Sequence, residues 1–227
     1  MIGDKLIIET FHTQTAKRVV DAIKDKIKEK KKYSISVGGE SGSGKSELAF
    51  EIHRLLFEEG IKAGVLQQDD YFIFPSKTCH QMRLNNIEQV GAYEARLDFM
   101  EANIYNFKEG MEKIYKPLSI YDEDRLTTEF MVVKDLDVLI AEGTFCTQMR
   151  FIDTKVFINR DYRDSKEKRE KRARDVMGDF IERVLQKEHK VVSEHKKLAD
   201  IVVKKDFSGI DIQDRVEVEG PYRTVEG

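Results

Sequence analysis

The chain has 227 residues, enough for one large globular domain with a sizeable buried core. It is 40% hydrophobic and 36% charged, with a formal net charge of −3, so no general attraction to nucleic acid or an anionic membrane is indicated. No apolar run reaches the roughly 20 residues of a membrane-spanning helix, and the first five residues lack the pattern of a signal peptide. We therefore expect a cytoplasmic protein without a nucleic-acid or membrane partner, and leave open whether it forms a homo-oligomer.

Short apolar runs alternate with helical patterns along the chain. In order, the predicted strands are Lys5–Glu9, Tyr33–Val37, Ala63–Gln67, Leu118–Tyr121, Glu129–Val133, Val138–Ala141, Lys155–Ile158 and Asp200–Val203. Helices are predicted at His12–Lys31, Lys45–Glu59 and Arg163–Lys187, and the region Thr78–Lys116 is predicted to be largely helical. Strands separated by helices predict a parallel sheet flanked by helices, in one domain.

A glycine-rich motif, GESGSGKS, joins the strand at residues 33–37 to the helix at residues 45–59. It matches the P-loop pattern, in which glycines bring backbone N–H groups close to phosphate oxygens at the start of a helix. Lys45 is predicted to neutralise the β- and γ-phosphates of a nucleotide, and the Ser46 hydroxyl to ligate Mg²⁺. The nucleotide-binding residues predicted here are Gly39, Glu40, Ser41, Gly42, Ser43, Gly44, Lys45, Ser46 and Glu47.

Three acidic residues follow predicted strands, at the sheet edge where open α/β folds bind ligands. Asp69 and Asp70 come after the strand at residues 63–67, and a carboxylate there can accept the proton of a hydroxyl that attacks a phosphoryl group. The neighbouring Tyr71 is included with Asp70 among the predicted substrate-binding residues. Glu142 ends an apolar strand in the manner of a Walker-B acid, so we predict it as a second Mg²⁺ ligand.

The segment Arg163–Lys187 is rich in lysine and arginine. By composition alone it reads as a solvated helix with alternating charges. In a nucleotide kinase, a mobile basic helix supplies positive charge to the transferring phosphoryl group. Arg169 and Arg172 share a helix face and are predicted to act in catalysis, and Arg174, on another side, to contact the nucleotide.

Together these motifs resemble the uridine kinase and phosphoribulokinase family of P-loop kinases, over residues 33–203. The marks are the P-loop, the segment 68–72, Lys116-Pro117 with Tyr121-Asp122, the strand 138–143, the segment 172–175 and the segment 197–202. The segment 68–70 is also similar to nicotinamide riboside kinases. The resemblance implies a three-layer P-loop fold with a parallel sheet of about five strands and a helical lid, with ATP and Mg²⁺ as cofactors.

The resemblance also implies roles and boundaries. Asp69 is the implied catalytic base, and the acceptor is a hydroxyl of a nucleoside, a sugar or a related metabolite. We expect a kinase domain at residues 33–205, an N-terminal strand and helix at 1–32, and a tail at 206–227. The alternative is a P-loop ATPase or GTPase-like regulator without a small-molecule acceptor, although no Asn-Lys-x-Asp segment for guanine is present.

Departures from the family pattern fall in the acceptor region. Tyr121 is predicted to bind substrate and begins the family's Tyr-Asp-Phe segment, but Glu123 replaces its aromatic residue. Leu126 and Thr128 stand where uridine kinases carry a histidine and an arginine. Because leucine would leave a polar atom of the base unpaired, we expect uridine to be a poor acceptor.

Overall fold

The computed structural model describes residues 2, 6–166 and 179–216 of the chain. Its helices are α1 (Thr10–Lys28), α2 (Lys45–Glu58), α3 (Ser76–Asn85), α4 (Leu97–Lys108) and α6 (Asp179–Val192). Its strands are β1 (Tyr33–Gly39), β2 (Ala63–Gln67), β3 (Lys113–Ile120), β4 (Arg125–Val132), β5 (Val138–Glu142), β6 (Thr154–Ile158), β7 (Ile201–Val203) and β8 (Ile210–Ile212). A short 3₁₀ helix, η1 (Gln68–Tyr71), follows β2.

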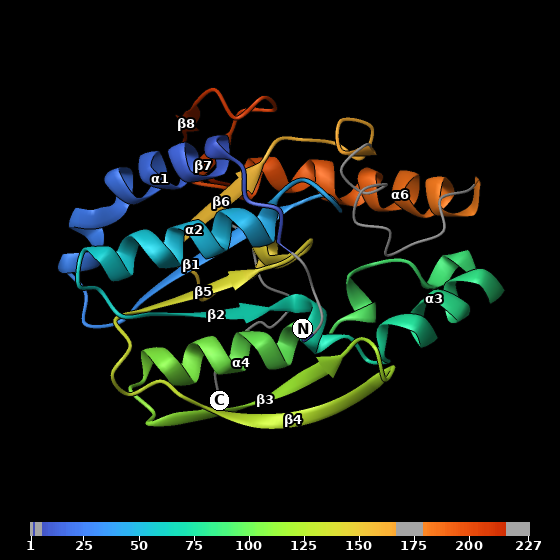
Figure 1. The fold of residues 1–227 in the computed structure, drawn as a ribbon, viewed down its shortest axis with the longest axis horizontal. Coiled ribbons are helices and arrows are strands. Elements are labelled where there is room, and N and C mark those ends of the chain that lie inside the picture. Colours follow the sequence, from blue (N-terminus) through green and yellow to red (C-terminus); the bar gives the residue numbers. More distant parts are fainter. Residues whose placement is uncertain (1, 3–5, 167–178, 217–227) are drawn as a thin grey trace, which may run out of the picture.

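The central sheet has the order β2-β5-β1-β6-β7-β8 (Figure 1). The first five strands are parallel, as predicted, and β8 joins the edge antiparallel to β7. In the register of the sheet, Glu142 of β5 pairs with Val37 of β1 and with Gln67 of β2. The P-loop, η1 and Glu142 therefore meet at the carboxyl edge of the sheet.

Helices cover both faces of this sheet. On one face, α1 and α2 lie side by side and contribute Val19, Ile23 and Leu48 to a core that includes Ile140 of β5 (Figure 1). Leu139, the neighbour of Ile140, points to the other face and packs in a second core with residues of α4. Successive strand residues alternate between faces. Because both faces of β5 are covered, its sequence is a continuous apolar run.

The second core extends beyond the sheet to a separate two-stranded hairpin. Strands β3 and β4 pair antiparallel from Lys113↔Val132 to Ile120↔Arg125. The hairpin lies along α4, on the side away from α1 and α2 (Figure 1). Ile114 of β3 packs with Met100 and Phe107 of α4, which fixes the hairpin beside the carboxyl edge of β2.

Several sequence-based predictions need correction. Residues 6–9 of the predicted first strand are not in a strand; instead Ile2 forms an isolated parallel bridge with Ile120 of β3. The region Thr78–Lys116 holds α3, α4 and the start of β3, with irregular chain between the helices, because turns at residues 86–96 interrupt the helical pattern. Strand β8 was not predicted. Of the long helix predicted at Arg163–Lys187, residues 163–165 form a turn, and α6 continues beyond it to Val192.

None of the described helices combines the length and hydropathy that a bilayer-spanning segment requires.

Candidate active site

The P-loop connects β1 to α2 by a turn that only glycine adopts readily. Gly42 has φ 78° and Gly44, which caps α2, has φ 105°. These left-handed values direct the chain so that α2 begins at Lys45, and the first backbone N–H groups of a helix have no acceptor within it. The loop therefore offers N–H donors and the positive end of α2 to an anion. Lys45 extends along the loop, where its Nζ donates to the Glu40 carbonyl oxygen at 3.0 Å.

Two P-loop residues are tied to α6. The Glu40 carboxylate is only 4% exposed, lies 2.6 Å from His189 Nδ1 and accepts the Tyr162 N–H at 2.8 Å. Burial raises its pKa, while the bonds to His189 and Tyr162 oppose the rise. Beside it, the Ser41 N–H donates to Glu188 Oε1 at 3.0 Å. The Glu40 side chain thus anchors the loop to α6, a role that local sequence does not indicate.

Glu47, which sequence analysis placed with the nucleotide, lies in the first turn of α2 and is 1% exposed. Its Oε1 accepts the backbone N–H of Ile7 at 3.4 Å. The carboxylate therefore contacts the N-terminal segment that precedes α1.

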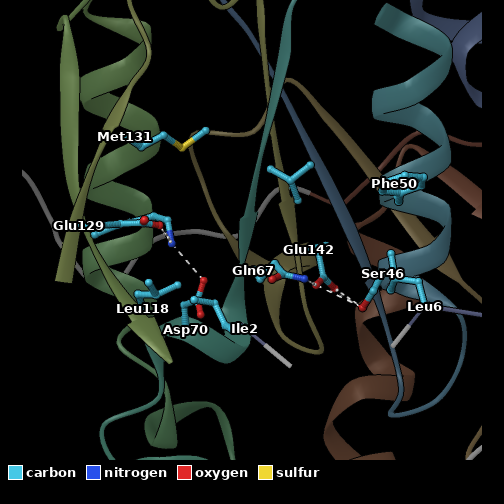
Figure 2. A pocket seen from close by; sticks show the side chains of 12 residues that line it. Ile2, Leu6, Ser46, Phe50, Gln67, Asp70, Leu118, Glu129, Met131 and Glu142 are labelled. Atoms are coloured by element: carbon cyan, nitrogen blue, oxygen red, sulfur yellow. Dashed lines mark hydrogen bonds and ion pairs between the residues drawn. The ribbon is translucent and has the colours of Figure 1, made fainter. Parts of the chain in front are cut away.

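Ser46 and Glu142 meet beside the P-loop. The Ser46 hydroxyl lies 3.2 Å from each carboxylate oxygen of Glu142, and Gln67 Nε2 donates to Glu142 Oε1 at 3.3 Å (Figure 2). Burial, followed by the negative charge of Asp69, raises the pKa of Glu142 to about 7. The positive charge of Lys45 and the hydrogen bond from Ser46 act in the opposite direction. A buried carboxylate beside a hydroxyl is a donor set that suits a hard divalent cation, whose positive charge would favour the ionised carboxylate.

The adjacent carboxylates Asp69 and Asp70 have different surroundings. Asp70 is 2% exposed; its Oδ2 accepts from Lys116 Nζ at 3.0 Å, and its Oδ1 accepts from the Ser119 N–H at 3.0 Å. Asp69 is half-buried, close enough to Glu142 for its charge to raise the pKa of that group. Asp70 therefore joins η1 to the hairpin, while Asp69 faces the same region as Glu142.

The two predicted tyrosines lie apart from each other. Tyr71 is 1% exposed, packs in the second core and accepts from Asn103 Nδ2 at 2.9 Å, and burial raises its pKa. Its side chain is thus placed in the interior. Tyr121 lies in the turn after β3, with Lys77 Nζ 5.4 Å from the centre of its ring.

A cavity of about 410 Å³ opens between α2, β2, β5 and the hairpin (Figure 2). It is named the acceptor pocket for the role proposed below, and its lining residues are Ile2, Leu6, Ser46, Phe50, Val65, Gln67, Asp70, Lys116, Leu118, Glu129, Met131 and Glu142. Sequence analysis predicted the polar residues Ser46, Asp70 and Glu142 at this site. It missed Phe50 of α2 and the lining residues from β2, the hairpin and the N-terminal segment. Of these, only Lys116 appeared in the sequence analysis, as part of the family pattern.

The hairpin presents one face to this pocket. Directly paired residues of an antiparallel hairpin share a face, so Lys116↔Glu129 lines the pocket, whereas Pro117↔Thr128 and Ser119↔Leu126 belong to the opposite face. Leu126 and Thr128, whose identities led us to expect uridine to be a poor acceptor, are therefore turned away from it. The expectation about uridine stays a prediction, without support from these two positions.

The predicted lid arginines, Arg169, Arg172 and Arg174, lie outside the described residues. Their roles stay predictions.

The P-loop, two acids and an adjacent pocket thus lie together at one edge of the sheet. The family model described as "Phosphoribulokinase / Uridine kinase family" matches residues 34–207. The chain belongs to this family. It is accordingly an ATP-dependent small-molecule kinase with a hydroxyl acceptor, as the sequence motifs predicted.

Individual relatives are more distant. A uridine kinase of Leuconostoc citreum is 28% identical over 183 residues, which is 74% of this chain and 85% of that protein. A bifunctional α-galactosidase/sucrose kinase of Mediterraneibacter gnavus is 27% identical over 77% of this chain, but only 20% of that larger protein is covered. The structure of a possible uridine kinase from Bacillus stearothermophilus matches with a TM-score of 0.55 and 18% identity, covering 81% of this chain and 98% of that one. This last likeness shows the fold.

Proposed function

We propose that this kinase works in the cytoplasm and transfers the γ-phosphoryl group of Mg²⁺-ATP to a hydroxyl of a nucleoside, a sugar or a related metabolite in the acceptor pocket. The observation that carries this proposal is the position of Ser46. Ser46 lies in the first turn of α2, the helix that follows the P-loop. Its hydroxyl is 3.2 Å from the Glu142 carboxylate, and the residue also lines the acceptor pocket. A phosphoryl group bound at the loop would thus adjoin the pocket that holds the acceptor.

The P-loop residues supply the charge that phosphoryl transfer needs. The N–H groups at the start of α2 and the Lys45 ammonium are suited to the β- and γ-phosphates. Ser46 and Glu142 are the residues that would hold Mg²⁺, directly or through water; Mg²⁺, when bound, neutralises the charge that develops on the phosphate oxygens. Among the described residues, the hydrogen-bond acceptor of Lys45 Nζ is a neutral carbonyl oxygen, so Lys45 can turn toward phosphate without breaking an ion pair.

Asp69 is the proposed base. It accepts the proton of the acceptor hydroxyl and aligns that oxygen with the phosphoryl group. Its neighbour Asp70 is less suited because Lys116 and the Ser119 N–H already bind its two oxygens. We propose that Asp70 positions Lys116 and the hairpin at the substrate side of the site. We also propose that Tyr121 binds the substrate, that Arg169 and Arg172 act in catalysis, and that Arg174 contacts the nucleotide. No observation favours a regulatory ATPase or GTPase over this function.

The direct test is acceptor-dependent ADP formation. Purified protein with ATP and Mg²⁺ is mixed with a panel of nucleosides, sugars and other hydroxyl compounds, and ADP is measured with and without each acceptor. We expect ADP release to rise with at least one acceptor and to require Mg²⁺. ADP release at one constant rate regardless of acceptor would instead identify an ATPase.

A further inference from the structure

The apolar wall of the acceptor pocket includes two residues from outside the region that matches the family. The apolar lining residues are Ile2, Leu6, Phe50, Val65, Leu118 and Met131. Ile2 and Leu6 belong to the N-terminal segment, which precedes the matched residues 34–207. Figure 2 shows Ile2 on the side of the hairpin, near Asp70, and Leu6 on the side of α2, near Ser46.

Backbone hydrogen bonds hold Ile2 itself and Ile7, the neighbour of Leu6. The Ile2 N–H donates to the Ser119 carbonyl at 3.0 Å, and the Ile2 carbonyl accepts the Tyr121 N–H at 3.3 Å. On the other side, the N–H of Ile7 donates to the buried Glu47 carboxylate of α2. The N-terminal segment thus attaches to both the hairpin and the P-loop helix. Since these bonds use main-chain N–H and C=O groups, the side chains of Ile2 and Leu6 are available to contact a ligand.

The polar wall carries mainly negative charge. Asp70, Glu129 and Glu142 are its acidic side chains, and Lys116 is its only basic side chain among the described lining residues. Lys116 already pairs with two of these acids, at 3.0 Å to Asp70 and 2.9 Å to Glu129. With Glu142 assigned to Mg²⁺, Asp70 and Glu129 still exceed Lys116 by one negative charge on this wall. A phosphate or carboxylate on the acceptor would meet this partly desolvated surface, where like charges at short range repel.

We propose that the acceptor is a hydroxyl compound without a phosphate or carboxylate group, and that it packs an apolar face against Ile2 and Leu6. The N-terminal segment is then a specificity element of the kinase. This inference rests on the proposed function, because it concerns the acceptor of the same transfer. A nucleoside or an unphosphorylated sugar derivative with an apolar substituent has the required chemistry, and a sugar phosphate does not.

The charge selection is tested with matched acceptor pairs. In each pair a phosphate ester replaces one hydroxyl, and the pair is used only where product analysis shows that a different hydroxyl accepts the phosphoryl group: adenosine with adenosine 3′-phosphate, ribose with ribose 5-phosphate, and glycerol with glycerol 3-phosphate, with kcat/KM measured by ADP formation. We expect the unphosphorylated member of every reactive pair to be preferred by at least about tenfold. Preference for a phosphorylated member would overturn the inference and leave the kinase function intact. If no hydroxyl compound in these pairs or in the wider panel stimulates ADP release, the proposed function fails, and the inference with it.

The apolar wall is tested with Leu6→Ala and Ile2→Gln, on the best unphosphorylated acceptor. We expect each to raise the acceptor KM by about tenfold, since an apolar contact with the bound acceptor is lost, and to leave the ATP KM unchanged. Leu6→Met, which conserves volume, should restore most of the affinity. Ile8→Ala is the matched control, because Ile8 is exposed in the same segment and does not line the pocket. Thermal unfolding verifies that all variants fold. An acceptor KM that responds to Leu6→Ala no more than to Ile8→Ala would overturn the role of the wall.

Discussion

Asp70 and Lys116 form a buried ion pair, with Lys116 Nζ 3.0 Å from Asp70 Oδ2 and both side chains less than a tenth exposed. The pair joins η1, at the carboxyl edge of the sheet, to the hairpin that forms the far wall of the acceptor pocket. Removing Asp70 would leave the buried Lys116 with the more exposed Glu129 as its remaining acidic partner, which weakens the compensation of its charge. Asp69, one residue earlier, lies close enough to Glu142 for its charge to raise the pKa of that carboxylate. The role proposed for Asp69 in catalysis is thus separable from the structural role of Asp70.

We predict that substituting Asp69 affects turnover, whereas substituting Asp70 affects stability. Asp69→Asn should lower kcat by about 10²–10⁴-fold, since the general base is lost, with thermal stability and ATP affinity almost unchanged. Asp70→Asn should lower the free energy of unfolding by about 1.5–3 kcal/mol, because Lys116 loses one charged hydrogen-bond partner and keeps the other, Glu129. Kinetic assays and urea unfolding on both variants give the comparison. If Asp70→Asn abolished turnover in a protein of normal stability while Asp69→Asn stayed active, the two assignments would have to be exchanged.

A second prediction concerns the P-loop. Lys45→Ala should reduce kcat by at least about 10²-fold, because positive charge at the transferring phosphoryl group is lost, while the protein stays folded. Lys24→Ala is a suitable control, since Lys24 is a surface lysine of α1 that pairs with Asp21. Ser46→Ala should raise the Mg²⁺ concentration needed for half-maximal rate, since it removes one proposed ligand. Unchanged Mg²⁺ dependence in that variant would exclude the hydroxyl as a ligand.

Gly143 is predicted to tolerate no side chain. A Cβ at this position would lie 2.2 Å from Gln68 Cβ and 2.6 Å from Gln68 Oε1. Because Gln68 begins η1 and its Oε1 accepts the Phe145 N–H, Gly143→Ala should displace the segment that carries Asp69. We expect loss of both stability and kcat, measured by thermal unfolding and ADP formation. Gly209→Ala, where the nearest atom would be 3.7 Å away, is the control. Wild-type behaviour of Gly143→Ala would show that Gln68 can move without cost.

The buried His195 should make the protein sensitive to mild acid. Burial, and then the charges of Lys155 and Lys197, lower its pKa from 6.5 to about 4. Between these values the unfolded chain binds a proton that the folded chain does not, so stability is lost as pH falls from about 6.5 to about 4. The shift corresponds to about 2–3 kcal/mol by pH 4.5. Urea unfolding at pH 7 and pH 4.5 should therefore show a smaller acid loss for His195→Gln than for wild type; equal losses would contradict the assignment.

Local pattern was sufficient for much of the fold. The strand at residues 63–67 matches β2 in both bounds, and Gly60, with φ 79°, ends α2 as its position indicated. Both results depend on local sequence alone: the strand on its apolar pattern, and the helix end on the freedom of glycine to take positive φ. The family match and the kinase activity followed from such motifs in their order along the chain. The first strand was wrong because Ile2 pairs with Ile120, far along the chain, rather than within a regular local strand.

The sequence by itself determined the P-loop, the parallel sheet and the class of reaction, because each is encoded in a short run of residues whose spacing has a direct geometric meaning. The tertiary structure alone decided which aspartate pairs with Lys116, that Leu126 and Thr128 face away from the pocket, and that Ile2 and Leu6 line it. A shift of one residue reverses the face of a strand residue, and a contact between distant segments leaves no local periodicity. The P-loop is therefore visible in the chain itself, whereas the acceptor pocket exists only once the N-terminal segment, the sheet edge and the hairpin have come together.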